Sequence, residues 1–216
     1  MATRVLMVRH GDTEASKEGR FTGAQNIPLS KEGRIHASEL ATRLSRYPID
    51  AIYASSLHRA LDTAGFIGAV QGLPVTSVDA LREMSHGVWD GKSYDEVVAL
   101  CGESQVAEYN RDPYHFRPDG GESGEDVLKR AVPALQELVR QHRNQTILVV
   151  AHKTTNRLLI CHFLGIDPML YRDKLAQRPA CLNVLDFPNE NNAQLLLLND
   201  IGHYAMSDSK EFAYVV

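Results

Sequence analysis

Cysteine is scarce in this sequence, with three residues among 216, at positions 101, 161 and 181. An odd number of widely spaced cysteines supplies neither a disulfide framework nor the paired spacing of a zinc site. We therefore expect reduced thiols, a cytoplasmic protein and no bound metal. No apolar run approaches the ~20 residues that cross a bilayer. The start, MATRVLMVRHGD, carries charge too early for a signal peptide.

An excess of basic residues is also missing. Lysine and arginine number 23 against 27 aspartates and glutamates, which gives a formal net charge of -4. Binding to nucleic acid or to an anionic membrane requires clustered lysine and arginine that neutralise many phosphates. The composition therefore argues against both partners. A small anionic substrate stays open, because it needs only a local basic pocket.

The chain does contain strand-like apolar runs that alternate with helical patterns. Its length and its 44% hydrophobic content suit one domain over residues 1–216. Strands are predicted at 3–8, 50–54, 74–78, 146–151, 182–187 and 194–198. Helices are predicted from Ser30 and over 57–68, 94–100, 122–143 and 154–164. This order predicts a three-layer α/β/α sandwich with a mostly parallel central sheet. Residues from about 80 to 121 are expected to form a lid-like insertion over the carboxyl ends of the strands.

Three predicted strands are followed at once by polar residues. The segments are VLMV-RHGDT, AIYA-SSLHRA and ILVV-AHKTTN. Parallel strands end at the same edge of a sheet, so Arg9, His10, Arg59 and His152 are expected to meet in one pocket. Guanidinium groups bind phosphate through a planar fork of donors. A helix that begins near Lys153 adds backbone N–H groups, and the pocket is therefore predicted to bind an oxyanion.

Ordered motifs along nearly the whole chain resemble those of the histidine phosphatase (phosphoglycerate mutase-like) superfamily. The matching segments are RHG at 9–11 with Thr13, GRF at 19–21 with Gly23, PLS at 28–30 with Gly33 and Ala37, SSLHRA at 55–60, LRE at 81–83 with Gly87, Trp89 and Gly91, GGES at 120–123 and AH at 151–152. One RHG alone would be weak evidence, but this series in order is specific.

The resemblance implies a role for each catalytic residue. His10 attacks phosphorus and becomes phosphohistidine, while Arg9, Arg59 and His152 bind the phosphoryl oxygens. Glu83 protonates the leaving oxygen and then deprotonates the attacking water. This cage of donors supplies the positive charge that a metal would bring, so we expect neither metal nor cofactor. The nearby Asp79 and Asp90 are the alternatives to Glu83, and Trp89 is expected in the core or the pocket wall.

Further residues are candidates for binding substrate: Ser16, Thr22, Gly23, His86, Lys153 and Thr154. Ser16 stands where many members have a phosphate-binding asparagine. Lys153 and Thr154 replace residues that are often small, and Lys153 either adds charge to the rim or is solvated. His86 either contacts a substrate carboxylate or phosphate or faces solvent, and His203 is a weaker candidate of the same kind.

The resemblance leaves a choice between phosphatase and mutase. A mutase must retain a bisphosphate and exclude water, which takes more cationic groups over the pocket. After Glu83 the sequence reads Met-Ser-His-Gly, without paired arginines. We therefore expect a phosphomonoester hydrolase that acts on a small phosphorylated metabolite through phosphohistidine. The alternatives are a cofactor-dependent phosphoglycerate mutase and a catalytically weak regulatory domain. The sequence leaves open whether the chain forms a homodimer.

Overall fold

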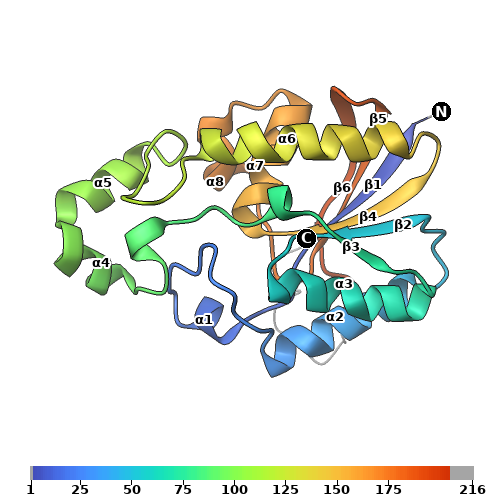
Figure 1. Cartoon of the computed structure of the whole chain (residues 1–216), viewed down its shortest axis with the longest axis horizontal. Helices are drawn as coiled ribbons and strands as arrows, with labels where there is room; N and C mark the ends of the chain where they lie inside the picture. The colour runs from blue at the N-terminus through green and yellow to red at the C-terminus, as the bar shows by residue number, and fades with distance from the viewer. Residues whose placement is uncertain (1, 205–216) are drawn as a thin grey trace, which may run out of the picture.

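The computed structural model describes residues 2–204, in which one six-stranded sheet lies between two layers of helices (Figure 1). The strands run in the order β3-β2-β4-β1-β5-β6. The first four in this order are parallel, while β5 and β6 are antiparallel to their neighbours. The strands are β1 (Thr3–Arg9), β2 (Ala51–Ala54), β3 (Val75–Ser77), β4 (Thr146–Ala151), β5 (Leu182–Asn189) and β6 (Asn192–Asp200). The predicted sandwich with a mostly parallel sheet is confirmed.

The two central strands, β1 and β4, are apolar because both of their faces are covered. In β1, Val5 and Met7 belong to the core on one side of the sheet, and Leu6 and Val8 to the core on the other. All four side chains are at most 1% exposed. Full burial of one such side chain stabilises the fold by roughly 1.5–3 kcal/mol.

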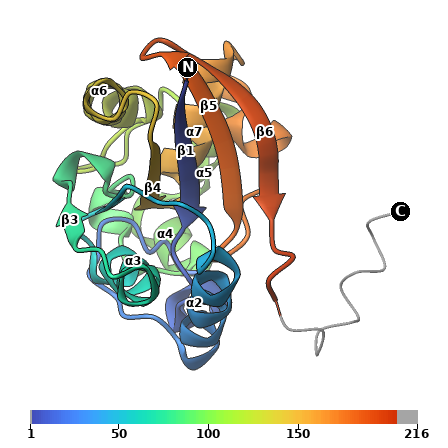
Figure 2. The ribbon, with the colours of Figure 1, turned by 90° about the vertical axis from the view of Figure 1, so that its right-hand side faces the viewer.

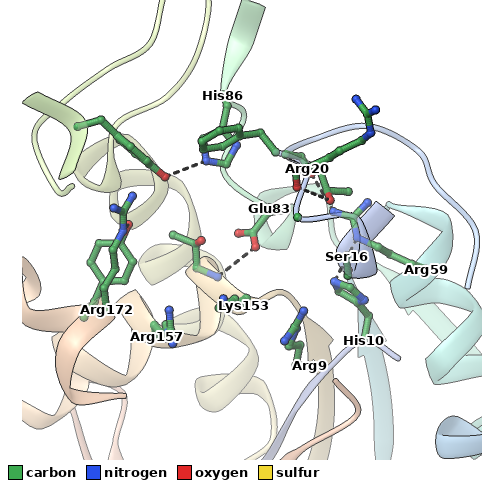
Figure 3. Close-up of a pocket in the computed structure, with 17 residues that line it drawn as sticks. Arg9, His10, Ser16, Arg20, Arg59, Glu83, His86, Lys153, Arg157 and Arg172 are labelled. Carbon is green, nitrogen blue, oxygen red and sulfur yellow. Dashed lines mark hydrogen bonds between the residues drawn. The ribbon is translucent and has the colours of Figure 1, made fainter. Parts of the chain in front are cut away.

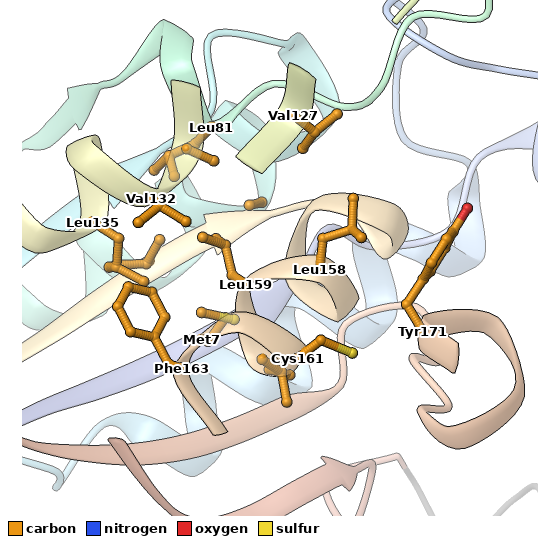
Figure 4. Packing of buried hydrophobic residues seen from close by; sticks show 14 of the residues in the cluster. Met7, Leu81, Val127, Val132, Leu135, Leu158, Leu159, Cys161, Phe163 and Tyr171 are labelled. Carbon is orange, nitrogen blue, oxygen red and sulfur yellow. The ribbon is translucent and has the colours of Figure 1, made fainter. Parts of the chain in front are cut away.

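Two helices cover each face of the sheet, as the two views show (Figures 1 and 2). α6 (Gly124–Gln141) and α7 (Lys153–Leu164) lie on one face, and α2 (Lys31–Leu44) and α3 (His58–Gln71) on the other. Figure 4 shows Leu135, Leu158 and Phe163 packing between the sheet and the first pair. Among residues 2–204, no helix is long and apolar enough to cross a bilayer.

The sequence signals for helix starts hold in the structure. The Ser30 hydroxyl accepts a hydrogen bond from the Gly33 N–H at 3.0 Å. Ser123 caps α6 in the same way, and the Asp126 carboxylate accepts a bond from the Ser123 N–H in return. Such caps satisfy N–H groups that have no partner within the helix.

The segment between β3 and α6 extends beyond the edge of the sheet and carries two helices, α4 (Tyr94–Cys101) and α5 (Glu103–Arg111) (Figure 1). Two 3₁₀ turns precede them, η1 (Asp79–Leu81) and η2 (Gly87–Trp89). An aromatic cluster anchors this segment, in which Trp89 is fully buried and contacts Phe21, Tyr109 and Phe116. The prediction did not include α5, whose sequence ESQVAEYNR buries only Val106 and Tyr109. Short helices complete the chain: α1 (Glu14–Lys17), η3 (Pro168–Leu170) and α8 (Tyr171–Lys174).

Candidate active site

A pocket of about 410 Å³ opens at the carboxyl ends of the parallel strands (Figure 3). Except for His152 and the weaker candidate His203, the residues predicted for the site line it: Arg9, His10, Ser16, Thr22, Gly23, Arg59, Glu83, His86, Lys153 and Thr154. The parallel order of β1, β4 and β2 brings these distant segments together. The predicted convergence of the three strand ends is therefore present.

His10 lies at the base of the pocket with one ring nitrogen fixed. Its Nδ1 is 2.6 Å from the Gly11 carbonyl oxygen, which can only accept, so Nδ1 carries the proton. The opposite atom, Nε2, accepts a hydrogen bond from Arg59 Nε at 3.2 Å. Burial, with Arg59 and Arg9 nearby, lowers the pKa of His10 well below its usual value of 6.5. The ring is therefore a neutral imidazole whose lone pair is on Nε2.

Two arginines lie beside this histidine. Arg59 is 1% exposed, and its guanidinium also donates to the carbonyl oxygens of Gln25 and Gly23 at 2.6 and 2.8 Å. Burial lowers its pKa to about 10, so it remains charged at neutral pH. Arg9 donates through Nη1 to the Gln177 carbonyl oxygen at 2.6 Å, while its buried Nε has no protein partner among the described residues. Arg9 therefore has donor capacity left for a ligand.

His152 lies next to His10, with ring centroids 5.1 Å apart, but it is fully buried and does not line the pocket. Its Nε2 shares a 2.7 Å hydrogen bond with the Ser55 hydroxyl. Its buried Nδ1 has no partner in the described part of the chain. Burial and the neighbouring Arg59 lower the pKa of His152 well below 6.5, so this ring is neutral too.

The Glu83 carboxylate occupies the N-terminus of α7. Oε2 accepts a hydrogen bond from the Thr154 N–H at 3.0 Å, and Oε1 accepts one from the Thr155 N–H at 3.2 Å. The Met84 N–H and the Thr155 hydroxyl donate to Oε1 as well. These donors and the positive end of the helix dipole hold the carboxylate facing the pocket. Only 8% of the residue is exposed.

The two alternatives to Glu83 lie elsewhere. Asp79 is paired with Arg82 and accepts a bond from Ser56, with 71% of its side chain exposed outside the pocket. Asp90 does not line the pocket either. It holds the backbone at His86, which does line the pocket. Its Oδ1 accepts a hydrogen bond from the His86 N–H at 3.0 Å. Geometry therefore leaves Glu83 as the carboxylate of the pocket.

The loop after β1 forms one wall of the pocket. Ser16 and Thr13 share a 2.8 Å hydroxyl–hydroxyl hydrogen bond that fixes Ser16 in α1 at the pocket surface. Gly23 has φ +46°, and a Cβ there would lie 1.7 Å from Asp90 Oδ1. Only glycine fits at this position. Thr22, beside it, donates to the Arg20 carbonyl oxygen at 3.4 Å.

The structure shows where the remaining candidates lie. His86 is 8% exposed and shares a 3.3 Å hydrogen bond with the Tyr109 hydroxyl, so it does not face solvent. Lys153 lines the pocket, and burial, with Arg157 and Arg9 nearby, lowers its pKa. His203 lies beside Tyr204 and does not line the pocket.

Several lining residues escaped prediction: Gly19, Arg20, Phe21, Tyr109, Arg157, Tyr171 and Arg172. Arg157 had a signal in the sequence, because it lies four residues after Lys153 on a predicted helix and so shares its face. Tyr109 and Arg172 come from helices that the sequence did not indicate. The segment directly after Glu83 contributes no arginine to the pocket, as its sequence indicates, and Arg157 and Arg172 come instead from α7 and α8.

Known proteins with similar sequences match most of the chain. The profile of the histidine phosphatase superfamily (branch 1) matches residues 5–201. The chain is 35% identical over 164 residues to phosphoserine phosphatase 1 of Hydrogenobacter thermophilus, with 76% of this chain and 77% of that protein covered. It is 35% identical over 170 residues to glucosyl-3-phosphoglycerate phosphatase of Mycolicibacterium vanbaalenii, with 76% and 75% covered. Bisphosphoglycerate-dependent phosphoglycerate mutases also match.

Solved structures agree with the sequence comparison. Bacillus stearothermophilus YhfR superposes with a TM-score of 0.87 at 28% identity, covering 93% of this chain and 98% of that one. The likeness therefore extends over the sheet, its helices and the segment that borders the pocket.

Proposed function

The chain belongs to the histidine phosphatase superfamily, and on that basis we propose that it hydrolyses phosphate monoesters of small metabolites by way of a phosphohistidine at His10. One observation carries the proposal: a neutral imidazole in a pocket bordered by Arg9 and Arg59, whose Nε2 lone pair is held only by a 3.2 Å hydrogen bond from Arg59 that a bound phosphate would replace. Glu83 borders the same pocket and is suited to proton transfer. Three free cysteines fit the cytoplasmic location expected from the sequence.

In the first step, His10 Nε2 attacks phosphorus as the bond between phosphorus and the alcohol oxygen breaks. The leaving oxygen takes a proton from Glu83, and the product alcohol departs. Arg9 and Arg59 donate to the phosphoryl oxygens, whose charge must be held in place during transfer. His152, buried beside His10 with Nδ1 unpartnered among the described residues, is the third donor that the family resemblance implies. The Gly11 carbonyl keeps the proton on Nδ1 and stabilises the positive charge that the ring acquires.

In the second step, a water molecule attacks the phosphohistidine. Glu83, now ionised, takes a proton from this water, and the bond between phosphorus and Nε2 breaks. The products are inorganic phosphate and the original imidazole. The proton taken from water leaves Glu83 protonated, as the next cycle requires. The four hydrogen bonds that it accepts in the free protein hold it in position for both transfers.

Phosphoglycerate mutase is the second candidate function, because the cations Lys153, Arg157 and Arg172 could retain a bisphosphate. We favour hydrolysis because the two relatives at 35% identity are named phosphatases. Incubation with 3-phosphoglycerate is expected to release phosphate, or to give no product, with little 2-phosphoglycerate. Rapid isomerisation stimulated by a bisphosphate would instead support the mutase.

Trapping the intermediate tests the mechanism. Wild-type protein quenched during turnover of a ³²P-labelled ester should carry a label that survives alkali and is lost in acid, located at His10. His10→Ala should carry no label and lose activity by a factor of about 10⁴ or more, because no other group forms the intermediate. Activity should persist in excess EDTA. An absent label, or activity that requires added divalent metal, would refute the proposal.

A further inference from the structure

Three cationic side chains gather at the side of the pocket away from His10. Lys153 is the first residue of α7, Arg157 follows one turn later on the same face, and Arg172 comes from α8. In Figure 3 Arg172 and Arg157 lie across the pocket from His10 and Arg59, and Lys153 lies between Arg157 and Arg9. Arg157 and Arg172 therefore border the part of the pocket that is away from the nucleophile.

These three cations have no carboxylate partner. Within residues 2–204, no aspartate or glutamate oxygen lies within 4 Å of their nitrogens, although other arginines are paired. Arg20 also lines the pocket, but it bonds Glu18 and Glu96, both at 2.8 Å. The buried Nε of Arg157 has no hydrogen-bond partner in this part of the chain. The nearest carboxylate of the pocket, Glu83, raises the pKa of Lys153 and Arg157 only in part and forms no ion pair with either.

The cluster is also held in place. The Arg172 guanidinium lies over the Tyr109 ring, 3.9 Å from its centroid, and its Nε donates to the Tyr171 hydroxyl at 3.0 Å. Stacking on an aromatic ring orients a guanidinium while its terminal nitrogens remain able to bind an anion. Burial, with Arg9 as the next cause, lowers the pKa of Arg157. Lys153 is exposed, and Arg157 and Arg172 are half-buried, so all three remain open to an anion that enters the pocket.

We propose that Lys153, Arg157 and Arg172 form a subsite for a second anionic group, a carboxylate or a phosphate, carried by the same substrate. This inference rests on the proposed hydrolysis at His10. The phosphoryl group that is transferred would bind between Arg9 and Arg59. The second anionic group therefore belongs to the alcohol part of the substrate. The enzyme then prefers phosphorylated acids or bisphosphates to esters whose other end is neutral.

Three esters with the same three-carbon skeleton test the preference. Glycerol 3-phosphate has a neutral end, 3-phosphoglycerate a carboxylate and glycerol 1,3-bisphosphate a second phosphate. The wild-type kcat/KM for 3-phosphoglycerate, for glycerol 1,3-bisphosphate or for both should exceed that for glycerol 3-phosphate. The expected factor is about 10-fold or more, because the second anionic group makes charge-assisted hydrogen bonds. The better of the two identifies the group that the subsite takes.

Variants connect the preference to the subsite. Arg157→Gln and Arg172→Gln should each lower the ratio of kcat/KM values, anionic over neutral, by about 10-fold, and Arg172→Lys should restore part of it. Arg140→Gln on the surface of α6, where Arg140 pairs with Glu137, is the matched control and should keep the wild-type ratio.

The possible failures are distinguishable. Wild-type protein that does not hydrolyse even p-nitrophenyl phosphate contradicts the proposed function. Two results would contradict the subsite alone, in a protein that does hydrolyse p-nitrophenyl phosphate. One is an equal kcat/KM for all three esters, and the other is an unchanged ratio of anionic over neutral kcat/KM in both glutamine variants.

Discussion

The two neutral histidines beside each other at the base of the pocket use opposite ring nitrogens. His10 engages Nδ1 with the Gly11 carbonyl, and His152 engages Nε2 with the Ser55 hydroxyl. The other nitrogens differ as well: His10 Nε2 accepts a hydrogen bond from Arg59, and the buried Nδ1 of His152 has no partner among the described residues. Their pKa values are lowered chiefly by burial, so neither ring needs to lose a proton before phosphate binds. One side chain can act as nucleophile and the other as a donor because their backbone and hydroxyl partners differ.

Replacement of Glu83 by glutamine should affect substrates according to their leaving group. An alkoxide must be protonated as it leaves, so phosphoryl transfer from glycerol 3-phosphate should slow by roughly 10²–10⁴-fold. The more stable p-nitrophenolate should lose less than about 10-fold in the same step. Single-turnover kinetics should be used, because loss of the base in the water attack slows both substrates alike. Equal losses in the first step would show that Glu83 is not the acid.

Residues that follow a strand or carry a motif could be predicted, because their positions are fixed locally. His10, Arg59 and His152 each follow a strand by a few residues, and parallel pairing then brings them together. Tyr109 and Arg172 could not, because they meet across 63 residues of chain through one stacking contact. Nothing in the composition of either segment signals that contact.

At the level of elements, prediction succeeded where one periodicity was strong. β4 reads TILVVA, with five of its six residues buried, and α6 carries an apolar stripe behind a capping box. α5 was missed because it packs only two side chains, at the end of a segment interrupted by Gly102 and Pro113. Its stability comes from the aromatic cluster around Trp89, which is a tertiary contact.

Removal of the α6 cap should cost stability without loss of catalysis. Ser123→Ala deletes the hydroxyl that accepts a bond from the Asp126 N–H at 3.2 Å, at a cost of about 1 kcal/mol in the free energy of unfolding. For a chain of this size the melting temperature should fall by roughly 2–4 °C. Ser93→Ala, which removes the cap of α4, is the comparison, and a smaller effect is expected because α4 buries only Val97. A Ser123→Ala protein as stable as wild type would contradict this account.

At the level of the whole molecule, the buried histidines link stability to pH. Both pKa values are lower in the folded protein than the value of about 6.5 expected after unfolding. Below pH 6.5 the unfolded chain therefore binds more protons, so the stabilisation is complete above this pH and decreases as pH falls. The slope contributed by each histidine approaches a limit of about 1.4 kcal/mol per pH unit as the pH falls below 6.5.

Urea unfolding at several pH values measures this link. Between pH 6.5 and 5.5, His10→Asn should lose less stability than wild type, by about 1 kcal/mol. His58→Asn, at an exposed position on α3, is the control and should follow the wild-type slope. Identical slopes for wild type and His10→Asn would mean that His10 is not buried as a neutral ring.

The position of β1 in the sheet also determines how the chain is made. β1 spans residues 3–9, but the strands on either side of it, β4 and β5, span 146–151 and 182–189 (Figure 2). On the ribosome this apolar strand emerges long before either partner, and at 5–20 residues per second it waits roughly 7–30 s for β4. During that time it can pair with other nascent chains or be held by a chaperone. A fragment that stops before β5 should leave β1 as an open edge and aggregate, and the pocket can form only after α7 and α8 have been made.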